Sequence, residues 1–317
     1  MASIAEINGL TIPSSGGGFT GLLDETYGSG AAAAYSTRRL ASATTVLLRV
    51  RRVTGTGNTG NDDEANFKFD TATDDLTLSS PIDDAGSSSA TNLGQFLNAT
   101  GYTDADSLGS PADGFVDTWT DQSGNSNNAE QNTPGSQPQI FDSSSPTDLI
   151  KENGKPAIYF SGTLVSTNTL SIGTSQRSVF HVTHDDQVNP ARIHYGLTNA
   201  SSGNGSKYNI TGETAVRVLG FATWTNDQLD SQSLAAVIMT GSQLSDVDFY
   251  KNGSLKTRTG LSDRTINTAT GNLVLGGEGN GLNTFIGRHQ EFILWISNQS
   301  SNRSAIETDI NSHFSIF

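Results

Sequence analysis

The chain has 317 residues, a net charge of −14, 34 glycines, 8 prolines and no cysteine. A chain without cysteine has neither disulfides nor thiolate metal sites, and so negative a field argues against nucleic acid and membranes as partners. Hydrophobic residues make up 34% of the chain and charged residues only 16%, which predicts a folded, turn-rich, all-β protein rather than a disordered chain.

Residues 1–18 predict an extended arm followed by a glycine-rich hinge. The apolar side chains of the arm are Ile4, Ile7, Leu10 and Ile12. A short segment of this kind suits pairing with another sheet or another subunit, and a frayed terminus is the alternative. The segment lacks the basic start and the apolar core of a signal peptide, so we expect no secretory leader.

The segment from residue 19 to 53 predicts a short helix and a strand. Four consecutive alanines are the best helix formers, and Arg38 and Arg39 suit a helix C-terminus, which together favour a helix within Gly30–Leu40. Alternating apolar residues predict a strand at Val46–Val53.

The segment 54–114 is polar and acidic, and Lys68 is its only lysine or arginine. We interpret it as an acidic insertion, a loop on one edge of the sheet with a short helix near Asn92–Leu97. A run of carboxylates is usually a solvated surface, and metal or partner binding is the alternative.

A polar turn follows a predicted strand at Gly114–Thr120. Asp121, Ser123 and Asn125 carry side chains that stabilise turns through hydrogen bonds to the backbone. The same carboxylate, hydroxyl and amide oxygens are ligands that Ca²⁺ accepts. Both interpretations stay open, so Ca²⁺ is a cofactor that the sequence permits.

Two Asn-Gly pairs predict tight turns between strands. Asn153-Gly154 precedes a strand that buries Ile158 and Phe160 and points Tyr159 the other way. Asn252-Gly253 is the preferred type I′ hairpin turn.

The rest of the C-terminal half predicts antiparallel strands and one helix. His181 and His184 would face opposite sides of a strand, which argues against a shared metal site. A final helix, capped by Ser301, would dock an apolar stripe onto the sheets. The stripe consists of Ile306, Ile310 and Phe314. Strands are expected at residues 178–183, 193–197, 215–219, 234–240, 272–276 and 290–295.

Four stretches resemble a known family. They are "LLD" at 22–24 with "LRVRR" at 48–52, "DQSGN" at 121–125 with "NGKPAIYF" at 153–160, the Asn252-Gly253 hairpin, and "QEFILW" at 290–295 with the last helix. They resemble the concanavalin A-like, laminin-G-like jelly-roll modules common in phage and bacterial surface proteins. Those modules are distantly similar to the catalytic domain of family-54 α-L-arabinofuranosidases. The resemblance implies one antiparallel jelly-roll β-sandwich over residues 19–317, with short peripheral helices.

The same resemblance implies where a glycosidase would keep its catalytic acids. Retaining glycosidases need two carboxyl groups about 5–5.5 Å apart. Glu278, in "GGEGNG", lies where the relatives carry an aspartate as acid/base. Glu213 lies in the region of their nucleophile but lacks its motif, and their cysteine pair is missing. We therefore expect no enzymatic activity; the alternative is a glycoside hydrolase of the α-L-arabinofuranosidase type that uses Glu278 and Glu213.

We interpret the chain as a phage virion structural protein, such as a capsid decoration, head-fibre or tail-associated subunit. The arm would attach it to other virion proteins, the module would form a homo-oligomer on the virion surface, and the sandwich would bind host glycans. Candidate glycan-binding residues are Trp224, Asn226, Tyr208, Glu278 and Asn280. Trp224 is the first choice because its neighbours are polar.

Overall fold

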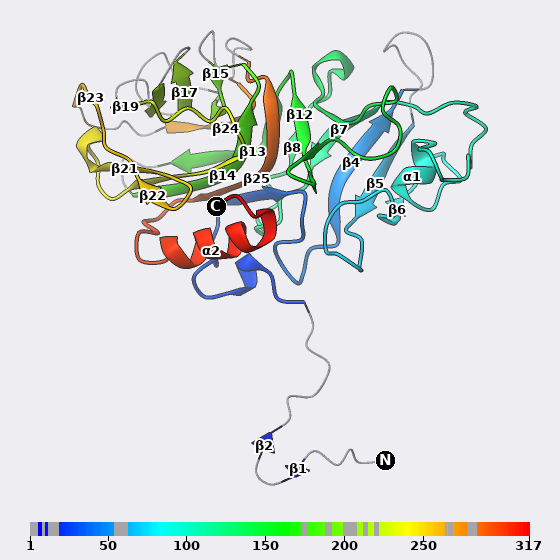
Figure 1. Ribbon diagram of the computed structural model, residues 1–317, viewed down its shortest axis with the longest axis horizontal. Helices are drawn as coiled ribbons and strands as arrows, with labels where there is room; N and C mark the ends of the chain where they lie inside the picture. The colour runs from blue at the N-terminus through cyan, green and yellow to red at the C-terminus, as the bar shows by residue number, and fades with distance from the viewer. Residues whose placement is uncertain are drawn as a thin grey trace.

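The structure is a computed structural model that describes residues 6–7, 10–11, 19–53, 63–172, 176–187, 192–198, 208–211, 215–218, 222–263, 265, 269–277 and 284–317. Over these ranges the chain is an antiparallel β-sandwich with few helices, which confirms the expected fold class (Figure 1). No helix in the described part of the chain has the length and apolar character needed to span a membrane.

The lower layer of the sandwich has the strand order β22-β21-β20-β14-β25-β12-β9-β7, continued beyond β7 by β4, β5 and β6, with β3 also paired to β25. Its strands are β3 (Ala33–Ser36), β4 (Val46–Arg52), β5 (Glu64–Lys68), β6 (Ile82–Asp84), β7 (Gly114–Trp119), β9 (Gln139–Phe141), β12 (Ile158–Phe160), β14 (Arg177–Asp185), β20 (Ser233–Met239), β21 (Val247–Lys251), β22 (Ser254–Leu255) and β25 (Gly287–Trp295).

The upper layer combines the strands β8-β13-β24-β16 with a separate small sheet of order β15-β17-β18-β19-β23. These strands are β8 (Ala129–Glu130), β13 (Leu164–Ile172), β15 (Arg192–Ile193), β16 (Tyr195–Leu197), β17 (Tyr208–Thr211), β18 (Ala215–Val218), β19 (Ala222–Thr225), β23 (Gly260–Leu261) and β24 (Ala269–Leu275). Two short hairpins form two-stranded sheets of their own, without strand pairing to either layer. They are β1 (Glu6–Ile7) with β2 (Leu10–Thr11), and β10 (Lys151–Glu152) with β11 (Lys155–Pro156).

The lower layer and the strands β8-β13-β24-β16 of the upper layer are two parts of one folded sheet. Strands β8 and β9 follow each other along the chain and both pair with β7, yet β8 continues to β13 in the upper layer and β9 to β12 in the lower layer. The chain changes layers in the same way between the consecutive strands β12 and β13 and between β24 and β25. Bent segments that switch sheets are a usual way to make the corner of a sandwich.

The main core lies between the layers, and a second apolar cluster lies beneath the lower layer. Helix α2 (Arg303–Phe314) packs there against β14, β20 and β25, as Figure 1 shows. Its buried residues Ile306, Ile310 and Phe314 recur every four positions, which confirms the predicted stripe. The N-cap is Asn302, one residue beyond the predicted Ser301.

The helix predicted within Gly30–Leu40 is wrong. Ala33–Ser36 is the strand β3, paired with β25. Ala33 belongs to the main core and Ala34 to the cluster beneath the lower layer, so small side chains fit a strand that is buried on both faces. Tertiary pairing has overridden the helix propensity of alanine here, since most helical stability comes from packing.

The acidic insertion is more than a loop on one edge. It contains β5, β6 and the predicted helix, α1 (Leu93–Phe96), and its residues Phe67 and Phe96 belong to the main core. Asp75 in this segment is 5% exposed, so the acidic run is not uniformly solvated. The remaining short helices are η1 (Leu22–Asp24), η2 (Pro134–Ser136) and η3 (Leu244–Asp246).

Both Asn-Gly turns are confirmed. Asn153 and Gly154 have φ of 48° and 75° between β10 and β11, and Asn252 and Gly253 have φ of 52° and 74° between β21 and β22. Positive φ at both central residues is the mark of a type I′ hairpin, which glycine and asparagine adopt most readily.

Candidate functional site

Several residues singled out from the sequence lie outside the described part of the chain. These are Ile4, Ile12, Glu213, Glu278 and Asn280. For three more, Ile7, Leu10 and Tyr208, the backbone belongs to a strand but the side chain is not described. The glycosidase pair and the arm therefore stay predictions.

The prediction that Trp224 is an exposed sugar platform is wrong. Its side chain is 1% exposed and packs against Phe249 in the main core, with ring centroids 5.5 Å apart. Its indole nitrogen donates to the carbonyl of Lys256 at 3.2 Å. Polar neighbours in a strand show only that the adjacent residues face outward, because side chains alternate. Asn226 is exposed in the turn after β19, and its role stays a prediction.

The side chains of the polar turn hold the turn itself. The Asp121 carboxylate is buried and accepts four hydrogen bonds, from the backbone nitrogens of Ala34, Ser123 and Asn127 at 2.9–3.0 Å and from the Ser123 hydroxyl at 2.8 Å. The Asn125 amide donates to the carbonyl of Ala31 at 2.8 Å. The residues therefore fit the turn interpretation, and a Ca²⁺ ion at Asp121 would have to displace existing donors.

A hollow of about 480 Å³ lies beside this turn. Its lining is polar or small and contains no aromatic side chain: Gly30, Ala31, Ala32, Ser123, Asn125, Asn127, Thr169, Leu170 and Ser171. It offers hydroxyl and amide groups but no ring on which a sugar could stack.

His181 and His184 face opposite sides of β14, as predicted. His181 is 2% exposed, and burial lowers its pKa to about 3, so its ring is neutral. It packs in the interior near His194 and His289, with ring centroids 5.5 and 6.2 Å away. Across the described ranges, no group of three or more histidine, aspartate or glutamate side chains has the arrangement of a metal site.

A row of polar and aromatic side chains crosses the face of the lower layer that points away from the sandwich interior, here called the outer face. Antiparallel partners place their side chains on the same face of a sheet. The strand register joins seven residues in line across β5, β4, β7, β9, β12, β25 and β14. This outer strip consists of Glu64, Arg51, Phe115, Gln139, Tyr159, Arg288 and His184.

Two half-buried aromatic rings lie in the outer strip with an amide between them. Phe115 and Tyr159 both pair with Gln139, so they lie two strand spacings, or about 10 Å, apart. The Arg51 guanidinium lies 5.2 Å from the Phe115 ring centroid, and its Nε donates to Oε1 of Gln137 at 2.6 Å. Aromatic faces and amides are groups that can hold sugar rings and hydroxyls.

The charges at the β25 end of the outer strip are paired. Arg288 Nη1 lies 2.7 Å from Asp186 Oδ1 and 3.3 Å from Glu152 Oε2. His184 Nδ1 lies 3.0 Å from the same Glu152 oxygen. Glu152 belongs to the β10–β11 hairpin, so the ion pairs tie this hairpin to the strip.

Two carboxyl groups, Asp117 and Glu130, form an acid pair beside the other end. Asp117 accepts from the Thr118 hydroxyl at 2.8 Å and lies 3.6 Å from Arg49 Nε. Burial raises the pKa of Asp117, and burial together with the Asp117 charge raises the pKa of Glu130. The Glu130 carboxylate makes no hydrogen bond or ion pair with any described residue. Its carboxylate is therefore available to a ligand.

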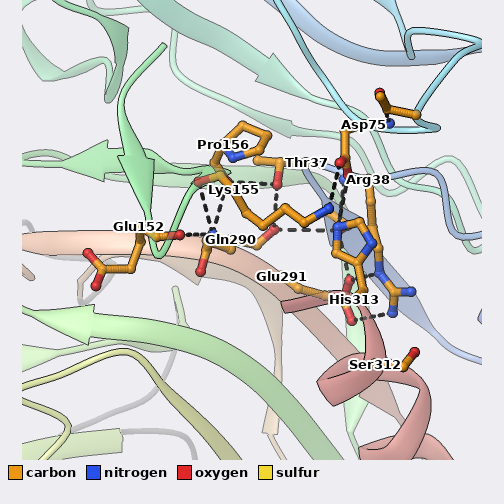
Figure 2. Close-up of polar contacts among 12 residues, drawn as sticks. Thr37, Arg38, Asp75, Glu152, Lys155, Pro156, Gln290, Glu291, Ser312 and His313 are labelled. Carbon is orange, nitrogen blue, oxygen red and sulfur yellow. Dashed lines mark hydrogen bonds and ion pairs between the residues drawn. The ribbon is translucent and has the colours of Figure 1, made fainter. Parts of the chain in front are cut away.

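Figure 2 shows a different polar group, where α2 meets β25 and β3. Arg38 Nε lies 2.8 Å from Glu291 Oε2, and Arg38 Nη2 lies 2.8 Å from Asp309 Oδ1 of α2. Glu291 is fully buried and Arg38 is 8% exposed. The pair closes the boundary between helix and sheet.

The neighbouring contacts in Figure 2 attach the acidic insertion and the β10–β11 hairpin. Asp75 Oδ2 lies 3.0 Å from Lys155 Nζ, and Asp75 Oδ1 lies 2.8 Å from His313 Nε2. Burial alone would raise the pKa of Asp75, but the hydrogen bonds and charges of His313 and Lys155 lower it. The Gln290 amide donates to carbonyls of the hairpin at 3.1–3.2 Å. These groups pair with one another across the boundary, so we assign them to stability.

Local sequence patterns do not reveal the outer strip. The alternation of the strand places Tyr159 on the face opposite the buried Ile158 and Phe160, and this is the one usable signal. The rest depends on strand pairing between residues far apart in the chain, such as Tyr159 with Arg288.

No protein-family model and no curated protein matches the chain. Among solved structures it is similar to an arabinofuranosidase complexed with arabinofuranosyl-α-1,2-xylobiose, with a TM-score of 0.54 and 14% identity over 89% of this chain and 62% of the other. A GH54 α-L-arabinofuranosidase soaked with a cyclic sulfate inhibitor gives a TM-score of 0.54 and 14% identity over 89% and 63%. The CBM40 of Ruminococcus gnavus IT-sialidase gives a TM-score of only 0.33, at 14% identity over 41% of this chain and 81% of the other.

The likeness to the arabinofuranosidases establishes the fold alone, because the identity is 14%. The chain spans less than two thirds of the length of those enzymes. The β-sandwich that the sequence resemblance implied is confirmed, while the relationship to phage and laminin-G-like modules stays a prediction.

Proposed function

We propose that this chain is a non-catalytic carbohydrate-binding module displayed on the surface of a virion, and that the outer strip is its ligand face. The observation that carries the binding proposal is the register that sets Phe115, Gln139 and Tyr159 side by side. Such a row offers two stacking surfaces with a hydrogen-bonding amide between them. The fold shared with arabinofuranosidases supports a glycan as the ligand.

A glycan array probed with the full chain tests the binding proposal. Tyr159→Ala is expected to lower the signal of every bound glycan at least tenfold, because it removes a stacking surface. Leu255→Ala is the matched control, since Leu255 is a large side chain, 59% exposed, on the remote strand β22. Equal signals for the two variants would place the ligand elsewhere.

The virion part of the proposal is supported by the sequence resemblance to phage modules. Residues 1–13 would attach the module to other virion proteins. Deleting them should leave the far-ultraviolet circular dichroism spectrum essentially unchanged and should release the protein from sedimented particles. Full retention of the deleted chain on particles would contradict attachment through this arm.

A second candidate function is glycoside hydrolysis of the α-L-arabinofuranosidase type. The observation that favours it is the shared fold over 89% of the chain. An enzyme would release 4-nitrophenol from 4-nitrophenyl α-L-arabinofuranoside, and Glu278→Gln would abolish the release by removing the acid/base. The display proposal expects no release from either protein.

A further inference from the structure

We infer that the outer strip and the adjacent acid pair bind an uncharged glycan, with the Glu130 carboxylate accepting hydrogen bonds from its hydroxyl groups. This inference rests on the proposed glycan-binding function and specifies the class of its ligand.

The charge balance of this face disfavours an anionic sugar. Among the described residues in or beside the outer strip, the guanidinium groups of Arg49, Arg51 and Arg288 are outnumbered by five carboxylates. The five carboxylates belong to Glu64, Asp117, Glu130, Glu152 and Asp186. The whole chain carries −14. Such a field repels sialylated, sulfated or uronic-acid glycans.

The cations on this face already have partners. Arg49 Nη2 lies 2.7 Å from Glu64 Oε2, and Arg288 Nη1 lies 2.7 Å from Asp186 Oδ1. Arg51 is 3% exposed and bonded to Gln137. An anionic sugar would therefore have to break existing ion pairs before it gained a cation, and recognition of a carboxylate normally depends on an accessible arginine.

Glu130 differs from the other carboxylates of this face. Of the five carboxylates it is the one that makes no hydrogen bond or ion pair with a described residue, whereas Asp117, Glu64, Glu152 and Asp186 are all paired. On β8, Glu130 is the cross-strand partner of Thr118 of β7, which follows Asp117, the other member of the acid pair. An ionised carboxylate accepts hydrogen bonds from hydroxyls about twice as strongly as a neutral acceptor does, and hydroxyls are what an uncharged glycan presents.

An array that pairs each neutral glycan with a sialylated, sulfated or uronic-acid counterpart tests this inference. The full chain should bind neutral members more tightly than their charged counterparts. Glu130→Gln keeps the shape of the side chain but removes its charge, so it should weaken neutral binding about tenfold, which corresponds to one charged hydrogen bond. Asp248→Asn removes the same charge from an exposed position on β21 and should change neutral binding less than twofold.

The outcomes separate this inference from the proposed function. Preference for charged glycans, or neutral binding that Glu130→Gln leaves unchanged or strengthens, would overturn the inference while keeping glycan binding. Binding of no glycan at all would overturn the proposed function and this inference with it.

Discussion

The outer face of the lower layer has two halves that share the same strands. Along β14, Phe180 and Val182 pack against the α2 side, and two residues further on His184 belongs to the outer strip. Along β25, Trp295 and Ile293 belong to the apolar cluster that α2 covers, whereas Arg288 belongs to the strip. The covered half is apolar and the open half is charged and aromatic. One strand can thus support stability at one end and recognition at the other.

The boundary between the halves is a β-bulge with buried charges. The register of β14 and β25 shifts between Val182 and Thr183, where Gln290 is the extra residue. Glu291, next to it, pairs with Arg38, and Gln290 holds the β10–β11 hairpin. Bulges re-aim side chains and interrupt a regular face, so this bulge separates the surface under α2 from the surface left open.

The largest effect is expected for Trp295→Ala in the covered half. Trp295 is fully buried, packs edge-to-face on Phe180 at 5.5 Å and donates to the carbonyl of Ser29 at 3.1 Å. Its truncation should lower the free energy of unfolding by about 3–5 kcal/mol, measured by urea unfolding followed by fluorescence or circular dichroism. A loss under 1 kcal/mol would mean that α2 does not depend on this face.

The boundary should show a smaller but still large effect. Arg38→Ala leaves the buried Glu291 carboxylate without its cation and should cost about 3 kcal/mol in urea unfolding. The double variant Arg38→Met with Glu291→Leu replaces both charges with apolar groups and should recover most of that loss. Equal losses in the single and double variants would show that the residues act through packing alone.

Asp185 follows His184 on β14 and should make the stability of the fold depend on pH. Its side chain faces the interior, and burial raises its pKa from the usual 3.8 to about 7, partly offset by the backbone nitrogen of Gln187 and by Arg192, with Asp186 adding to the rise. Between these values the folded chain keeps a proton that the unfolded chain releases, so stability falls as pH rises from about 4 to 7.

Asp185→Asn removes this dependence. The variant should match the parent near pH 4.5 and be more stable by up to a few kcal/mol at pH 8, measured by urea unfolding at both pH values. Parallel stability profiles for parent and variant would contradict the raised pKa.

The sequence predicted the positions of strands and turns better than it predicted which side chains face the core and which form a binding surface. Alternation and Asn-Gly turns located strands such as β4, β7, β14, β20 and β25 and both Asn-Gly hairpins, because these signals are local, but they missed long strands such as β13. The alanines of β3 misled because pairing with β25, more than 250 residues away, decides their conformation. Trp224 misled because alternation shows that neighbours differ in direction but not which one faces the core. The outer strip needed the register of seven strands, which no local pattern contains.

The smallest effect on stability is expected for Tyr159→Ala in the open half. Tyr159 is half-buried, and its direct cross-strand neighbours are Gln139 and Arg288. Such pairs contribute about 0.2–1 kcal/mol, so the urea midpoint should move little, while glycan binding should fall at least tenfold. Tyr159→Phe keeps the ring and should retain most of the binding. A loss of stability as large as that of Trp295→Ala would mean that Tyr159 is part of the core, and the distinction between a covered and an open half would then fail.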